Sequence, residues 1–204
     1  MSIFFVVVGA MTSYLDLLTF PLISLGIPLV LWLTLNDSQS IWKNICRIFL
    51  LSLSWAIGYV GMWVLKWGIG SIIIGENVVQ NALSAAQGRM SSSTPDTTFT
   101  YFDILLRQIK SSLQISWISA VFILILIWIV NVIKYKKINI HLYITYGLVA
   151  IFPLVWYGVL KNHSYIHHWF TYRELALSIY AGAACVMMQR KRMIGGGIVR
   201  KKQV

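Results

Sequence analysis

Long apolar stretches alternate with short polar links along this chain. The clearest stretch, residues 113–133, reads LQISWISAVFILILIWIVNVI and contains no Asp, Glu, Lys or Arg. At about 1.5 Å per residue, a helix of this length covers roughly 30 Å, the thickness of the hydrocarbon core of a bilayer. The pattern predicts about five membrane-spanning helices, over residues 17–35, 48–65, 113–133, 142–160 and 169–188.

The composition excludes an ordinary water-soluble domain. Charged residues make up 11% of the 204 residues, and the mean hydropathy is +0.73. Soluble domains carry about 25% charged residues, so we expect an all-α, polytopic integral membrane bundle that forms a single membrane domain over residues 1–204. Cys46 and Cys185 fall in or near apolar stretches and are expected to be small buried residues. No cofactor and no resident metal are predicted.

The basic residues indicate how the chain is oriented. The links 36–47 and 134–141 and the tail 189–204 together hold 11 of the 17 Lys and Arg residues, whereas the longer segments 66–112 and 161–173 hold 6. The positive-inside rule therefore places the first three in the cytoplasm and the C-terminus with them. We expect a plasma-membrane protein whose N-terminus and segments 66–112 and 161–173 face outward. The net charge of +11 follows from this tail and these links, so membrane lipids and not nucleic acid are the expected partners.

The outer segment predicts two amphipathic helices. Residues 77–90 place apolar side chains on one helical face, SSSTPD at 91–96 is typical of a turn, and a helical pattern resumes at about residue 99. We expect both helices to lie on the membrane surface, with Asp103 as a helix-start charge. Residues 3–10 are too short to cross a membrane alone, so they are expected to be interfacial, re-entrant or the remnant of a longer helix.

The densest polar sequence is KNHSYIHHWFTYRE at 161–174. His163 and His167 are four residues apart, so a helix would place both on one face, as a metal pair requires. Glu174 is the nearest acid for a third ligand. Arg173 has the forked donors that suit a phosphate. Three interpretations remain open: an interfacial loop in which His and Tyr serve for their amphipathic shape, an anion or lipid-phosphate site, and a metal site.

Asp16 is the candidate catalytic residue. It precedes the first predicted span at the outer face, and an acid at membrane depth is a functional hypothesis by default. The alternative is that Ser13 or Asp16 caps the N-terminus of that span. Lys66, at the outer end of the second span, is expected to extend its amine to the interface.

Two segments carry a resemblance to a known class. TSYLDLLTFPLISLGIPLV (12–30) and NHSYIHHWFTYRELALSIYA (162–181) resemble parts of bacterial multi-spanning proteins found with surface-polysaccharide genes, which are similar to GT-C glycosyltransferases. The resemblance implies a polytopic enzyme that uses lipid-phosphate-linked sugars at the outer face, with a polyprenyl-phosphate-sugar as donor. Its phosphate would be held by His163, His167, His168 and Arg173.

The chain departs from the family pattern at its N-terminal part. The family acid lies in an early outer loop after a first span, and no such span precedes Asp16 here. We therefore expect the C-terminal part of a longer protein, or a chain that needs a missing N-terminal half or a partner subunit. The alternatives are a non-catalytic transporter or accessory membrane subunit, and an inactive truncated fragment.

Overall fold

The computed structural model describes residues 1–15, 18–36, 40–135 and 138–201, with residues 135 and 194–201 described by their backbone alone. In this part of the chain every regular element is a helix, and Ser93 and Thr98 form an isolated bridge. The expected all-α class is confirmed. The elements in chain order are α1 (Ser2–Leu15), α2 (Leu22–Leu35), α3 (Ile41–Ile74), α4 (Val78–Met90), α5 (Tyr101–Ser112), α6 (Ile115–Tyr135), α7 (Ile140–Ala150), α8 (Phe152–Val159), α9 (Lys161–Ile166), α10 (His168–Thr171), the 3-10 helix η1 (Tyr172–Glu174) and α11 (Leu175–Lys201).

Three helical segments of the described residues are long and apolar enough to cross a membrane, where about five were predicted. They are α3, Ile115–Lys134 of α6, and Ile140–Val159, which combines α7 and α8. The first predicted span is shorter than expected because α2 begins only after Pro21 and has 14 residues. The fifth is interrupted because α10 and η1 precede α11, and Arg190 ends the apolar part of α11.

Two helices depart from their predicted ends for simple backbone reasons. Helix α3 runs from Ile41 to Ile74, well beyond the predicted 48–65, because it contains no proline and ends only at Gly75, whose φ of 74° is left-handed. The fourth predicted span is divided at Ile151, since Pro153 has no N–H to continue the hydrogen-bond ladder of α7. The two helices predicted within 66–112 are confirmed as α4 and α5.

Helix α1 is the largest difference from the sequence prediction. The short block 3–10 is part of a 14-residue helix that crosses α3 at two glycines. A Cβ on Gly9 would lie 2.1 Å from the backbone oxygen of Trp55, and a Cβ on Gly58 would lie 1.9 Å from that of Val6. The two backbones therefore approach each other more closely than any side chain would allow.

Because Val6 contacts Gly58 and Ser13 contacts Lys66, α1 runs in the same direction as α3. The beginning of α1 therefore points toward the end of the bundle where α3 begins. This differs from the prediction that the N-terminus lies at the opposite end from the C-terminus. The prediction missed this helix because Thr12 and Ser13 end its apolar run early in the sequence. In the structure the two hydroxyls donate to backbone carbonyls one helical turn back, Thr12 to Val8 O and Ser13 to Ala10 O.

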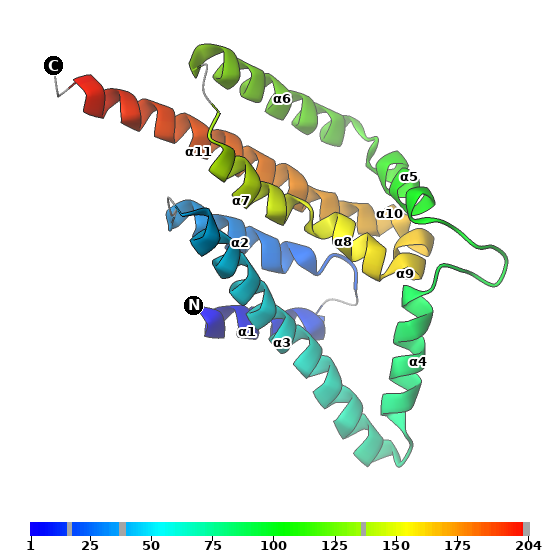
Figure 1. Ribbon diagram of the computed structural model, residues 1–204. Coiled ribbons are helices and arrows are strands. Elements are labelled where there is room, and N and C mark those ends of the chain that lie inside the picture. Colours follow the sequence, from blue (N-terminus) through cyan, green and yellow to red (C-terminus); the bar gives the residue numbers. More distant parts are fainter. Residues whose placement is uncertain (16–17, 37–39, 136–137, 202–204) are drawn as a thin grey trace.

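The polar links sort to two ends of the bundle (Figure 1). At one end, Asn139 N donates to Gln189 Oε1 at 3.1 Å, and α3 begins beside α7. At the other end, α5, α9, α10 and η1 contact one another, and Glu174 of η1 binds the first residue of α2. We call the first the basic end and the second the histidine-rich end. The described parts of the links 36–47 and 134–141, which were predicted for one compartment, thus lie at the same end.

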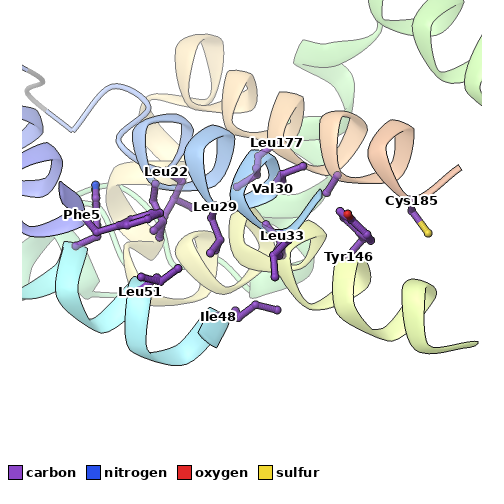
Figure 2. Packing of buried hydrophobic residues seen from close by; sticks show 14 of the residues in the cluster. Phe5, Leu22, Leu29, Val30, Leu33, Ile48, Leu51, Tyr146, Leu177 and Cys185 are labelled. Carbon is purple, nitrogen blue, oxygen red and sulfur yellow. The ribbon is translucent and has the colours of Figure 1, made fainter. Parts of the chain in front are cut away.

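Between the two ends lies an apolar core made by α2, α3, α7 and α11 with Phe5 of α1 (Figure 2). Leu29, Val30, Val149 and Leu177 are completely buried there. Gly26 lets α2 approach Leu177 of α11. Cys185 is buried at the edge of this core as predicted, whereas Cys46 is exposed on α3, contrary to the prediction.

Candidate functional site

The histidine-rich end contains five buried polar side chains that come from four different helices. We call Gln108, His163, Ser164, Thr171 and Glu174 the buried polar cluster; each is at most 7% exposed. They reach it from α5, α9, α10 and η1. Buried polar groups are usually paired within the protein, so the contacts of these residues define how this end is built, although the Ser164 hydroxyl has no hydrogen-bond partner among the described residues.

Gln108 is the centre of a hydrogen-bond network that ties α5 to the segment 161–174. Its Nε2 donates to the backbone oxygen of Ser164 at 2.7 Å and lies 3.0 Å from Thr171 Oγ1. The hydroxyl of Tyr157 on α8 donates to the backbone oxygen of Thr171 at 3.0 Å. One amide side chain therefore fixes α5 against both α9 and α10.

Glu174 is completely buried and binds the first backbone N–H of α2. Its Oε1 accepts from the backbone N–H of Leu22, the first residue of α2, at 3.2 Å. A carboxylate at a helix N-terminus is stabilised by the free N–H groups and by the helix dipole. Ser13 lies inside α1 and donates to Ala10 O instead, so it does not cap α2.

His163 holds the segment before α2 in an unusual conformation. Its Nε2 lies 2.9 Å from the backbone oxygen of Leu18, so Nε2 must carry a hydrogen because a carbonyl only accepts. Leu18 has a φ of 64°, a left-handed value that is rare for a residue with a branched side chain. A buried histidine and a strained backbone thus meet beside the N-terminus of α2, which is a usual sign of a functional region.

His163 and His167 do share one face, with ring centroids 4.8 Å apart, and His167 stacks on Phe170 at 5.2 Å. The described residues contain no group of three or more His, Cys, Asp or Glu side chains arranged for a metal ion. Glu174, the third ligand considered from the sequence, instead binds the start of α2. The described geometry therefore gives His163 a positioning contact with Leu18 and places no third ligand beside the two histidines.

His168 faces α5 and lies beside a cation. Its Nδ1 is 2.7 Å from Ser111 Oγ, and burial lowers its pKa, with the positive charge of Arg107 lowering the pKa further. Arg107 also lies over the ring of Tyr165, with its Cζ 3.8 Å from the ring centroid, and Phe99 stacks on the same ring at 3.9 Å. Arg107 therefore adds a fixed cation to this end of the molecule.

Arg173 is exposed, although Glu174 next to it is completely buried. Asp16 lies outside the described residues. On either side of it, Ser13 O accepts from Lys66 Nζ at 2.9 Å, and Leu18 O lies against His163. Lys66 also lies over the Tyr14 ring at 4.4 Å, so it binds the end of α1 and does not simply extend to the interface.

The structure thus places His163 against Leu18 before α2 and beside His167, whereas His168 faces Ser111 of α5. The sequence reasoning missed Gln108, Thr171 and Arg107 as members of this end. Neither Gln108 nor Thr171 carried a usable signal, since Gln108 lies on the face of α5 opposite the apolar Phe102 and Leu106, where a polar side chain is expected to be exposed.

No protein-family model, curated protein or solved structure matches this chain.

Proposed function

We propose that this chain is a multi-pass plasma-membrane protein whose histidine-rich end binds a lipid-phosphate-linked sugar and transfers the sugar at the outer face. One observation carries the proposal. The two segments that resemble lipid-linked sugar transferases, 12–30 and 162–181, are in direct contact through His163 with Leu18 and through Glu174 with Leu22, across 145 and 152 residues of sequence. The predicted acid and the predicted phosphate-binding residues would therefore belong to one site.

The proposal gives different tasks to these residues. Arg173 and the partly exposed His167 and His168 bind the donor phosphate, which leaves with the electrons of the bond to the anomeric carbon. Asp16 takes the proton of the acceptor hydroxyl, whose oxygen forms the new bond to that carbon. His163 is a positioning residue here, because it is buried and bound to Leu18.

The distribution of charge supports the orientation in this proposal. The links 36–47 and 134–141 lie at the end of the bundle opposite the buried polar cluster. Under the positive-inside rule the basic end is cytoplasmic and the histidine-rich end faces outward. Since α1 and α3 run in the same direction, the start of α1 also points to the cytoplasmic side.

The alternative of an ion-conducting transporter has less support. Between the two ends, the core contains Leu25, Leu29, Leu33, Leu51 and Leu177, all at most 5% exposed. Charged side chains along an ion pathway usually face the bundle interior, paired with one another or with water. Within the described residues the buried carboxylate, Glu174, lies at the histidine-rich end. The polar contacts between the ends are made by uncharged groups, such as Thr12 and Trp55 on Ser24.

The test is a transfer and binding assay on the full chain in detergent or nanodiscs, with a radiolabelled polyprenyl-phosphate sugar. Asp16→Asn should reduce turnover by about 10²–10⁴ while donor binding is retained. Arg173→Ala should weaken donor binding about tenfold, the loss of one charge-assisted contact. Lys43→Ala removes an exposed cation at the basic end and should change neither.

Equal turnover of wild type, Asp16→Asn and Arg173→Ala would overturn the proposal. Binding of the donor by the wild type without any turnover would instead assign the chain to the accessory-subunit class. Thermal unfolding of each variant, measured alongside, shows whether a lost activity reflects a lost fold.

A further inference from the structure

A second candidate site lies between α3, α4 and α8, and Leu18, whose carbonyl His163 contacts, lies at its wall. A cavity of about 350 Å³ lies between these helices, within the size range of ligand sites in proteins. Its walls are almost entirely apolar and include Trp63 and Trp67 of α3 and Trp156 of α8. Tryptophans concentrate where a membrane protein passes from hydrocarbon to the headgroup region.

The cavity exists because α4 is attached at its ends and not along its length. At its beginning, Val78 contacts the Gly70 position of α3, and just after its end Asn162 donates to Ser93 O. No residue of α4 is buried. Toward the cavity α4 presents Ala82 and Ala86, whose small side chains leave the space between the helices unfilled.

Polar groups at this cavity match an anionic amphiphile. Among the described residues that line it, Arg89 is the only one with a formal charge, and it is exposed in the last turn of α4. An apolar cavity with a single exposed cation suits a ligand that has an apolar chain and an anionic headgroup.

The surrounding membrane indicates which amphiphile would occupy the cavity. The cavity borders α3, one of the helices long and apolar enough to cross a bilayer, so bilayer lipid is the amphiphile present there at high concentration. A guanidinium favours a phosphate whose charge is not balanced by a headgroup amine.

We propose that the α3–α4–α8 cavity binds one acyl chain of an anionic glycerophospholipid from the surrounding membrane, with its phosphate on Arg89. The lipid would fill the space that the alanines of α4 leave open and hold α4 against α3. Arg89, Ala82 and Ala86, on which lipid binding depends, take no part in the proposed sugar transfer, so either proposal stands if the other fails.

The experiment is photo-crosslinking of the full chain in nanodiscs, with the adduct located by mass spectrometry. The probes are phosphatidylglycerol and phosphatidylcholine that carry the same diazirine acyl chain. We expect phosphatidylglycerol to label α3 or α4 at least about tenfold more, a difference of about 1.4 kcal/mol. Arg89→Ala should bring the two yields together, whereas Lys110→Ala, which removes an exposed cation on α5, should not.

A steric pair tests the position of the acyl chain. Ala86→Trp fills the cavity and should abolish labelling by both lipids, while Ser84→Trp adds the same bulk to an α4 residue that does not line the cavity and should leave labelling unchanged. Ala82→Leu is the smaller filling variant if Ala86→Trp does not fold.

Equal labelling by the two lipids, or undiminished labelling of a folded cavity-filled variant, would overturn the proposal. Displacement of phosphatidylglycerol by an equimolar polyprenyl phosphate would overturn the phospholipid assignment.

Discussion

The α1–α3 crossing and the buried polar cluster stabilise the fold by different physical means. At the crossing, Gly9 and Gly58 bring two helix backbones together, and the contact depends on shape. In the cluster, Gln108, Thr171 and Glu174 join segments far apart in sequence through hydrogen bonds. The crossing should therefore be sensitive to added volume and insensitive to pH, whereas the cluster should respond to loss of donors and acceptors and to protonation.

The largest expected effect is that of Gly58→Ala. The added Cβ would meet the backbone oxygen of Val6, which cannot move without shifting α1, so we expect the free energy of unfolding to fall by about 3 kcal/mol. Gly61→Ala on the same helix meets nothing within 4 Å and should be neutral or stabilising by up to about 1 kcal/mol. Unfolding in detergent micelles, followed by tryptophan fluorescence, measures both. Equal stability of the two variants would show that the helices do not cross at Gly58.

The next effect is that of Gln108→Leu. This change removes the donor to Ser164 O and to Thr171 Oγ1 while keeping most of the volume, and we expect a loss of about 1–3 kcal/mol. Adding Thr171→Val should cost less than the sum of the single changes, since the two side chains share one network. Gln87→Leu on the exposed surface of α4 should change stability by less than about 0.5 kcal/mol. Strict additivity of the double variant would indicate that no such network forms.

The smallest effect is a pH dependence from His168. Burial and Arg107 lower the pKa of this imidazole, so the unfolded chain binds the proton more readily than the folded chain. The free energy of unfolding should therefore decrease as the pH falls through the ordinary histidine pKa of about 6.5. His168→Gln should flatten this slope between about pH 7.5 and 5.5, a range that brackets the ordinary pKa. His141 is an exposed histidine on α7, and His141→Gln should leave the slope unchanged. Identical slopes for wild type and His168→Gln would contradict this assignment.

The outer helices show how far local sequence patterns reach. The turn chemistry of SSSTPD and the run of apolar residues on each side gave α4 and α5 nearly their observed bounds, and Asp103 does lie in the first turn of α5. It forms a capping box with Thr100, and hydrogen bonds from the Thr100 backbone and side chain lower its pKa. These features depend on residues within four positions of one another, which is why they could be predicted.

The candidate site was predictable only in part. The spacing of His163 and His167 correctly placed their rings side by side, because both lie within one helical turn. That Glu174 would bind the first N–H of α2, or that Gln108 would be buried, depends on contacts across 152 and 56 residues of sequence. No periodicity within either segment carries that information.

The amino-acid sequence by itself determined the helical class, the three long apolar segments and the separation of basic from histidine-containing links, since each follows from hydropathy, length and charge along the chain. Tertiary structure decided the rest. The direction of α1, the close approach at Gly9 and Gly58, and the binding of Leu18 and Leu22 by His163 and Glu174 arise only when distant segments pack together. The physical reason is that a buried polar group must be paired, and a helix backbone must be packed, with the residues that the fold brings near, whatever their distance in sequence.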